Sequence, residues 1–316
     1  MTLYEETNPQ DVSSEVVKAV LSRFFPSIST NEAQFLYHGT HNVFEVRGEY
    51  IFRFPDRMLF NQKGFDLIQR EKEALAFLRP FLSVDIPHFI YVSSNPKIPF
   101  AGYRKISGSS LNRCFHQATP EQRKQLAEQL GAFLSELHSF EIYQAFLSKW
   151  PTNFTPATYR QYWENIFVKV REKLFSQFSF AQKEWITSLF TNFIEEKENF
   201  RFAPRVIHGD FDTSNILVDS HSFRITGIID FEDVGVWDPA GDFLFYGEGL
   251  DFIKHLIASY QGPLGDNLEQ RMNFLVNRQP LCYLLTGFEW KYPQMIDFGF
   301  KMLEERMKTD YPCYKR

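Results

Sequence analysis

The sequence predicts an α+β protein with two lobes: an N-terminal lobe with an antiparallel sheet and a helix, and a larger, mainly helical C-terminal lobe. Short β-rich runs broken by turn residues fill residues 35–54. Helical spacing of apolar residues dominates from about residue 119 onward. Between them we place the division at residues 1–106 and 107–316, with a helical insertion at about 145–203 in the second lobe.

Length and charge limit the possible functions. The 316 residues are ample for two lobes, and a hydrophobic content of 44% is ordinary for a globular protein. The net charge of −5 argues against a nucleic-acid binder, which would carry a basic face. No apolar run is long enough to suggest a membrane span, and we expect a monomer.

Cysteine usage indicates a reducing compartment. Cys114, Cys282 and Cys313 are few, widely spaced and odd in number, which fits neither a disulfide framework nor a Cys-x-x-Cys metal pattern. Residues 1–9 show no basic and apolar signal segment. These features predict a cytoplasmic protein.

The N-terminal lobe begins with a predicted helix over residues 12–25, which Ser13 or Ser14 can cap and Pro26 follows. Strand-like runs then cover residues 35–37, 43–46 and 50–54. Turn residues at 38–42 and 47–49 separate them, so the lobe should open with an antiparallel meander.

Arg53 interrupts an apolar strand. An ionised side chain there is unfavourable unless it is paired or ligand-bound. The candidate partner is Glu71, on a helix predicted from about residue 66 to 78, and Glu73 is the competing one. The alternative is an edge-strand arginine that faces solvent.

The rest of the chain is mostly helical. A strand over 98–106 ends at Ser107-Gly108, and Pro120 then opens a helix that His138 ends. We interpret His138 as structural. Residues 159–200 hold two further amphipathic helices, followed by helices over 250–260 and about 267–283 and more helix to residue 307.

The most informative segment is Val206–Val218, followed by Ile228–Glu232. Asp210 can orient an acceptor hydroxyl and take its proton. Asn215, five residues later, and Asp230 offer the oxygen ligands that Mg²⁺ prefers. A hairpin between the runs 216–218 and 225–229 would hold them at neighbouring positions. With His208, this order and spacing matches the catalytic segment of kinases.

These residues, together with Asp238-Pro-Ala-Gly-Asp242, make the chain resemble the aminoglycoside phosphotransferase family, small-molecule kinases with a protein-kinase-like fold. The resemblance runs from about residue 35 to 290 and is densest over 206–243. It is strongest to the 2″-aminoglycoside phosphotransferases, through the segments 51–55, 100–106 and 133–139.

The resemblance implies roles residue by residue. Asp210 would be the catalytic base, Asn215 and Asp230 the Mg²⁺ ligands, and His208 and Asp242 supports of the catalytic loop. ATP or GTP would be the phosphate donor. The nucleotide-binding residues would be Gly39, Thr40, His41, Asn42, Arg53, Glu71 and the inter-lobe hinge Arg104, Lys105 and Ile106. Departures from the protein-kinase pattern include Gly209 in place of arginine, Glu232 in place of the glycine after Asp-Phe, and Arg53 in place of the lysine.

An acidic wall suggests a cationic small-molecule acceptor. Residues 225–252 contain no Lys or Arg, and acids there would attract a polycation such as an aminoglycoside. The candidate acceptor-binding residues are Glu232, Asp233, Glu248, Asp251, Glu289 and Trp290. The alternative is that these acids serve solubility.

Three other functions stay open. A metabolic kinase of the same family would act on choline, homoserine or a sugar, and a macrolide phosphotransferase would need a larger apolar pocket. A non-catalytic nucleotide-binding module would usually lack the base or a metal ligand, and this chain has Asp210, Asn215 and Asp230. We therefore expect O-phosphorylation of an aminoglycoside, a reaction that confers antibiotic resistance.

Overall fold

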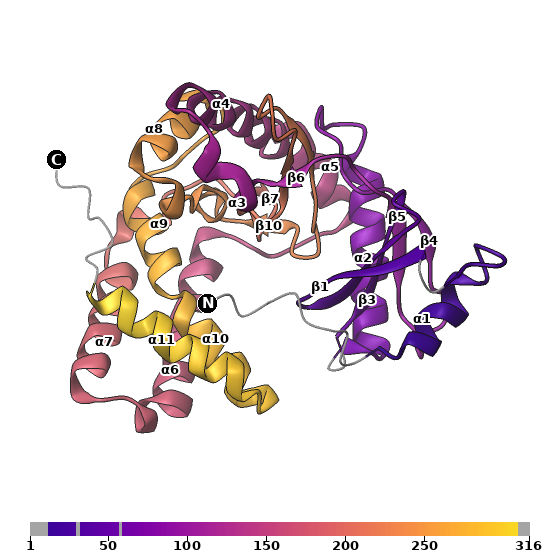
Figure 1. The fold of residues 1–316 in the computed structure, drawn as a ribbon. Coiled ribbons are helices and arrows are strands. Elements are labelled where there is room, and N and C mark those ends of the chain that lie inside the picture. The colour runs from indigo at the N-terminus through magenta and orange to yellow at the C-terminus, as the bar shows by residue number, and fades with distance from the viewer. Residues whose placement is uncertain (1–11, 30–31, 57–58, 309–316) are drawn as a thin grey trace. The chain divides into compact units, whose positions relative to one another are not determined.

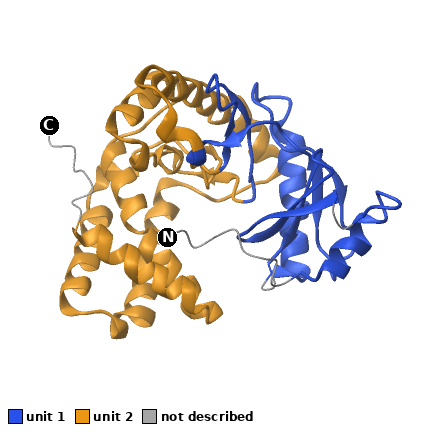
Figure 2. Cartoon of the chain, in the orientation of Figure 1, with its two compact units in different colours: residues 1–113, 215–232 blue, residues 114–214, 233–316 orange. Residues whose placement is uncertain are grey.

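The computed structural model describes residues 12–29, 32–56 and 59–308. The chain forms two compact units, residues 1–113 with 215–232 and residues 114–214 with 233–316 (Figure 2). This division differs from a single boundary at residue 106, because the segment 215–232 joins the first unit. The α+β class is as predicted, with strands concentrated in the first unit and helices in the second (Figure 1).

A five-stranded antiparallel sheet in the order β1-β2-β3-β5-β4 organises the first unit. Its strands are β1 (Ala33–His38), β2 (His41–Val46), β3 (Tyr50–Pro55), β4 (Phe89–Val92) and β5 (Ala101–Arg104). The predicted meander is confirmed as β1 to β3. The predicted strand over 98–106 is the shorter β5, and β4 was not predicted.

Two helices lie on opposite faces of this sheet. Helix α1 (Ser14–Leu21) is capped by Ser13, and buried residues of α1 share an aromatic-rich core with Phe52 of β3. Because neighbouring residues of a strand point to opposite faces, Arg53 projects to the other side. Helix α2 (Gln62–Leu78) meets Arg53 there through Glu71. It begins a turn before residue 66, because Asn61 caps it through the Lys63 N–H.

A second, three-stranded antiparallel sheet holds the hairpin between residues 216 and 228. It pairs β6 (Ser109–Ser110), β8 (Ile216–Val218) and β9 (Ile225–Ile228) in the order β6-β8-β9. The predicted hairpin is confirmed, and the Asp219 carboxylate closes its turn by accepting from the Ser222 N–H. Pairing of β8 with β6 is the reason why the hairpin belongs to the first unit.

The second unit is mainly helical. Helix α4 packs against α8, α6 against α7, and α10 against α11. Its helices are α4 (Pro120–Leu137), α5 (Phe140–Lys149), α6 (Pro156–Leu174), α7 (Phe180–Glu195), α8 (Leu250–Ser259), α9 (Leu268–Asn277), α10 (Gln279–Trp290) and α11 (Pro293–Lys308). The short helix α3 (Leu111–Cys114) crosses the boundary between the units, and a two-stranded sheet joins β7 (Arg205–Ile207) to β10 (Gly235–Trp237).

The helix predicted over about 267–283 is interrupted. Helix α9 ends at Asn277 and α10 begins at Gln279, with Arg278 between them. Pro280 lies in the first turn of α10, where its missing N–H costs nothing, whereas a continuous helix would need that donor. Proline therefore sets the break.

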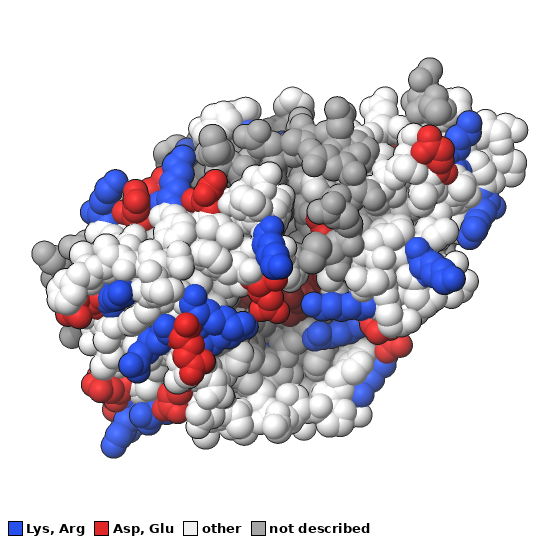
Figure 3. All heavy atoms as spheres, turned by 90° about the horizontal axis from the view of Figure 1, so that it is seen from below, with Lys and Arg blue, Asp and Glu red and all other residues white. Residues whose placement is uncertain are grey.

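Surface and cysteine features match the bulk composition. Among the described residues, no helix is both long and apolar enough to cross a membrane. Cys114 and Cys282 carry thiols, and Cys313 lies outside the described residues. On the face shown in Figure 3, basic and acidic side chains are interspersed rather than gathered into one field of a single sign.

Candidate active site

The His-Gly-Asp loop begins directly after strand β7, in the second unit. The Asp242 carboxylate accepts hydrogen bonds from the His208 N–H at 2.7 Å and the Gly209 N–H at 3.1 Å. Gly209 has a φ of 89°, and a Cβ there would lie 2.6 Å from the Asp233 carbonyl oxygen. The loop therefore requires glycine, where the protein-kinase motif has arginine.

Asp242 is itself held by buried partners. The residue has 0% exposure, and its Oδ2 lies 3.1 Å from Nε2 of His138, which is also fully buried. Nδ1 of His138 lies 3.0 Å from the Tyr260 hydroxyl. Burial raises the pKa of Tyr260, so the hydroxyl keeps its proton and can donate it to Nδ1 while Nε2–H donates to the carboxylate. The structural interpretation of His138 is confirmed.

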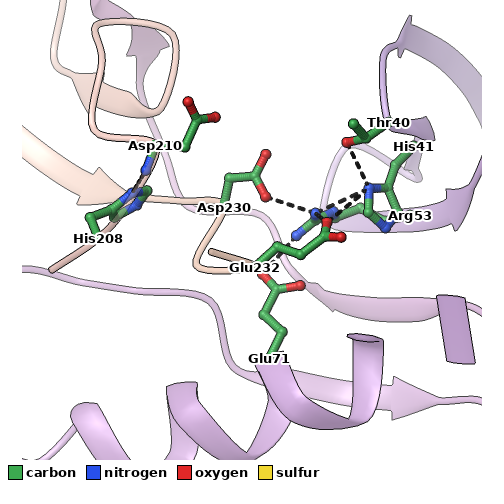
Figure 4. A network of polar contacts seen from close by, with 8 residues as sticks. All are labelled: Thr40, His41, Arg53, Glu71, His208, Asp210, Asp230 and Glu232. Atoms are coloured by element: carbon green, nitrogen blue, oxygen red, sulfur yellow. Dashed lines mark hydrogen bonds and ion pairs between the residues drawn. The ribbon is translucent and has the colours of Figure 1, made fainter. Parts of the chain in front are cut away.

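Asp210 is exposed at the end of this braced loop. Its N–H donates to Nδ1 of His208 at 3.3 Å, which fixes the backbone that carries the carboxylate (Figure 4). Burial raises the pKa of Tyr283 on α10, and the negative charges of Asp210 and Asp212 add to that rise. The fold of the second unit thus brings α10 close to the loop.

The hairpin presents the two predicted metal ligands. Asn215 directly precedes β8 and Asp230 follows β9, and the Ile229 N–H donates to the Asn215 carbonyl oxygen at 2.9 Å. Asp230 has a φ of 68°, a left-handed conformation that Asp tolerates better than most residues. The hydrogen bond between Ile229 and Asn215 places the start and the end of the hairpin at neighbouring backbone positions.

The donor set fits Mg²⁺ bound together with a nucleotide. Asn215 and Asp230 offer an amide and a carboxylate oxygen, and Mg²⁺ commonly takes one or two such ligands plus phosphates and waters. Among the described residues, no group of three or more His, Cys, Asp or Glu could hold a metal on its own. The ligands of an Mg²⁺ ion here would therefore be completed by phosphate oxygens and water.

Arg53 is the centre of a buried ionic network in the first unit. Its Nη1 donates to Oε1 of Glu71 at 2.8 Å, and its Nη2 donates to Oδ1 of Asp230 at 2.9 Å (Figure 4). Oε2 of Glu232 lies 3.8 Å from Nη2. The predicted Arg53–Glu71 pair is confirmed, and the competing Glu73 is exposed. The sequence did not predict the contact with Asp230.

Burial and the neighbouring charges together determine the pKa of each ionisable group in this network. Burial alone would lower the pKa of Arg53, but the carboxylates of Glu71 and Asp230 raise it well above its ordinary value. Burial raises the pKa of Glu71, although Arg53 acts in the opposite direction. The guanidinium of Arg53 therefore stays charged, and its positive charge stabilises the carboxylate of the buried Glu71.

The predicted nucleotide loop joins this network through His41. Burial, reinforced by the charge of Arg53, lowers the pKa of His41 to about 3, so the ring is neutral near pH 7. Its Nδ1 lies 3.3 Å from Nη2 of Arg53 and 3.2 Å from Oγ1 of Thr40. The Gly39 N–H donates to the His41 carbonyl oxygen, which closes the turn.

The side chain of Asn42 lies on the other face of the sheet from that of His41. Val43 pairs with Arg53 across the sheet and Asn42 pairs with Phe54, so the Asn42 side chain points to the face opposite Arg53. The side chain is fully buried, and neither of its polar atoms has a hydrogen-bond partner. Any nucleotide contact of Asn42 must therefore come from its backbone.

The predicted hinge residues begin with the last residue of β5 and continue beyond it. Arg104 lies opposite Tyr50 in the sheet, and the Lys105 N–H donates to the Glu49 carbonyl oxygen. A purine contact from Lys105 would thus have to use its carbonyl oxygen. The Ile106 side chain packs over Gly227, where a Cβ would lie 2.6 Å from it.

The predicted acceptor residues have different environments in the structure. Glu232 lies in the Arg53 network of the first unit. Asp233 is exposed after it. Asp251 is 90% exposed and pairs with Lys254, and Glu289 is 54% exposed and lies 3.5 Å from Lys169. Trp290 is half-buried at the end of α10.

Glu248 is the predicted acceptor residue that the second unit brings near the loop of Asp210. Its Oε1 accepts from the Thr213 hydroxyl at 3.3 Å. Burial raises the pKa of Glu248, and the charge of Asp212 contributes to the rise. Asp212 and Tyr283 were not predicted from the sequence as residues near Asp210. The position of Asp212, two residues after Asp210, could have indicated it. Nothing in the sequence indicates that Tyr283 lies near this loop.

Comparisons with known proteins show similarity at the level of the family and of the fold. A model of the phosphotransferase enzyme family matches residues 32–267. The chain is similar to the GDP and kanamycin complex of APH(2″)-IIIa, with a TM-score of 0.80, 26% identity and coverage of 93% of this chain and 99% of that one. The GDP complex of aminoglycoside 2'-phosphotransferase-IIIa matches with the same TM-score and identity, over 93% and 98%.

A curated relative, the uncharacterized protein YcbJ of Bacillus subtilis (strain 168), is 26% identical over 191 residues. The match covers 57% of this chain and 59% of that relative, so the chain spans about three-fifths of its length. The family model covers far more than half of the chain, and the structural similarity extends over nearly all of it. The chain therefore belongs to the phosphotransferase enzyme family.

Proposed function

We propose that this chain is a small-molecule kinase that transfers the γ-phosphate of ATP or GTP to a hydroxyl group of an aminoglycoside. The observation that carries the proposal is Asp210, an exposed carboxylate on a rigidly braced loop, with the acids Asp212 and Glu248 nearby in the same unit. A carboxylate so placed can orient a hydroxyl, and its acidic surroundings suit a cationic acceptor.

Each residue has a distinct role in this proposal. Asp210 orients the acceptor hydroxyl and takes its proton as the acceptor oxygen bonds to the γ-phosphorus and the bond from that phosphorus to the β-phosphate oxygen breaks, which releases the nucleoside diphosphate. Asp242 keeps the loop in place and does not react, since its oxygens are occupied by His208 and Gly209. Arg53 offers a positive charge for the donor phosphates.

Asn215 and Asp230 would hold Mg²⁺. When bound, the ion neutralises charge on the phosphates and aligns them for in-line transfer. Oxygen ligands on a short hairpin give it a rigid mount, since backbone hydrogen bonding fixes both ends of that hairpin.

The relatives support the choice of donor and acceptor. The structures of the similar proteins are described as complexes with GDP, and one also contains kanamycin. We therefore propose a purine nucleoside triphosphate as donor and an aminoglycoside of the kanamycin type as acceptor, whose phosphorylation would confer antibiotic resistance.

A metabolic acceptor is the second candidate, because fewer of the predicted acidic residues lack a basic neighbour than the sequence indicates. Glu289 and Asp251 both have lysine partners, and Glu232 faces Arg53. Fewer carboxylates suit an acceptor with one positive charge, such as choline or homoserine, as well as they suit a polycation.

An acceptor panel separates these candidates. Nucleotide turnover is measured with Mg²⁺ and kanamycin, gentamicin, streptomycin, erythromycin, choline or homoserine, each with ATP and with GTP. The proposal predicts acceptor-dependent turnover with kanamycin or gentamicin. Turnover confined to choline, homoserine or erythromycin would overturn the substrate class, and nucleotide binding without any turnover would favour a non-catalytic module.

A further inference from the structure

We propose that Arg53 occupies the Asp230 carboxylate in place of the divalent cation, so that the cation binds well only with a nucleotide that draws the guanidinium to its phosphates. This inference rests on the proposed function, because it concerns the metal ligand of the same site. Arg53 would then determine when the metal enters, in addition to contacting phosphate.

The two terminal nitrogens of the Arg53 guanidinium bond two different carboxylates. One guanidinium nitrogen of Arg53 bonds Glu71 at 2.8 Å and the other bonds Asp230 at 2.9 Å, so the same side chain joins the helix carboxylate to the metal-ligand carboxylate. The side chain of Glu71 is 1% exposed and that of Asp230 is 31% exposed. Glu71 therefore anchors Arg53 on the inside, while Asp230 is the partner within reach of solvent.

The charge balance explains why a cation would still be attracted. The carboxylates of Glu71, Asp230 and Glu232 surround a single guanidinium, and His41 is neutral. The network thus has more negative than positive charge. A divalent cation on Asp230 would nevertheless be repelled by Arg53 bonded to the same carboxylate, since like charges a few ångströms apart interact strongly away from bulk water.

Nucleotide phosphates would relieve this conflict. Arginine binds phosphate oxygens through the same fork that it uses for carboxylates. A nucleotide that takes over part of the guanidinium releases Asp230 and supplies further oxygen ligands for the cation. Free Mg²⁺ lacks both contributions and would depend on the proposed protein ligands Asn215 and Asp230.

Lysine at this position would behave differently. An ammonium is a compact charge on a flexible stem, whereas the planar fork bridges two carboxylates in fixed directions. Arg53→Lys keeps the charge and loses the fork, and Arg53→Gln loses the charge as well. The two variants separate the effect of bridging from the effect of charge.

The test measures binding of free Mn²⁺, as a paramagnetic substitute for Mg²⁺, to the full chain without nucleotide by electron paramagnetic resonance. We expect Arg53→Gln to bind Mn²⁺ at least about tenfold more tightly than the wild type, which corresponds to about 1.4 kcal/mol. Arg53→Lys should lie between them. Arg47→Gln is the matched control, since Arg47 forms an exposed pair with Glu32 in the same unit, and it should leave Mn²⁺ affinity unchanged.

Loss of structure cannot imitate the expected result, because damage to the site weakens cation binding. If Arg53→Gln does not fold, as judged by circular dichroism, Arg53→Lys decides. Unchanged or weaker Mn²⁺ binding in the folded variants would overturn the inference. Wild-type binding of Mn²⁺ together with a non-hydrolysable nucleotide is measured in parallel: its absence would contradict the proposed function, whereas its presence without a gain in the variants would contradict only the role of Arg53.

Discussion

At the scale of single residues, burial gives neighbouring acids different properties. Glu248 is partly buried and bonded to Thr213, whereas Asp251, three positions later, has a side chain that is 90% exposed and paired with Lys254. Both are on the predicted acidic wall. The difference in environment makes them a matched pair for locating the acceptor.

Glu248→Gln should raise KM for kanamycin about tenfold, a loss of about 1.4 kcal/mol that is typical of one charge-assisted contact. KM for the nucleotide should not change. Steady-state kinetics with each substrate varied in turn measure both. Asp251→Asn is the control, and an equal effect of the two substitutions would contradict the assignment of Glu248 to the acceptor.

His41 links stability to pH. Its pKa falls from 6.5 to about 3 in the fold, because burial and Arg53 disfavour the charged ring. The folded state therefore prefers neutral His41, and this contribution is complete above pH 6.5 and is lost as pH falls toward 3. Between pH 7.5 and pH 5.5 the loss should be about 1.4 kcal/mol.

Urea unfolding at these two pH values measures the effect. Other groups also titrate, so the quantity compared is the difference between wild type and His41→Asn, whose side-chain oxygen can still accept from Arg53. That difference should shrink at pH 5.5. The exposed His221→Asn variant serves as control, and a difference that stays constant with pH would show that His41 is not held neutral.

At the scale of elements, the loop that carries Asp210 depends on partners far away in the sequence. His208 and Gly209 follow β7, Asp242 lies in a short helix after β10, and His138 ends α4. His208, Asp242 and His138 are buried, and the contacts of this group connect three elements of the second unit. Asp242 therefore stabilises the loop through hydrogen bonds from the backbone N–H groups of His208 and Gly209.

Asp242→Asn should lower the free energy of unfolding by about 3 kcal/mol, because an amide nitrogen would face donors that now have a charged acceptor. Chemical denaturation followed by fluorescence measures it, and kcat should fall as well. Asp266→Asn, at an exposed position, is the control. Unchanged stability would mean that the Asp242 contacts contribute little to the loop.

Prediction from sequence succeeded for elements with local signals. The hairpin around residues 219–223 and the meander of β1 to β3 have turn residues between β-rich runs, and the Arg53–Glu71 pair follows from a charge within an apolar strand. The short strands β7 and β10 were not predicted, since three-residue strands show no periodicity. Helix α5 lies only partly within the helical insertion predicted at about 145–203.

Side-chain direction was the part that sequence could not give. Glu232 was predicted in the acidic wall, but its carboxylate lies near Arg53. Tyr283 is far from Asp210 in the sequence, and only the packing of the second unit brings α10 to the loop. Such relations depend on tertiary contacts, for which one sequence contains no pattern.

At the scale of the whole molecule, the residues proposed for phosphoryl transfer are divided between the two units of a member of the phosphotransferase enzyme family. The first unit contains Arg53, Asn215 and Asp230, and the second contains Asp210 and Asp242. The central claim is that these residues perform phosphoryl transfer to an aminoglycoside hydroxyl, with Asp210 as the base.

The most direct test follows radiolabelled γ-phosphate from ATP or GTP into kanamycin, for the wild type and Asp210→Asn side by side. The wild type should yield phosphorylated kanamycin, and Asp210→Asn should lower kcat by about 100-fold to 10,000-fold with nucleotide affinity unchanged. Near-normal transfer by Asp210→Asn would contradict the assignment of the base. Absence of labelled kanamycin with the folded, nucleotide-binding wild type would contradict the proposed reaction itself.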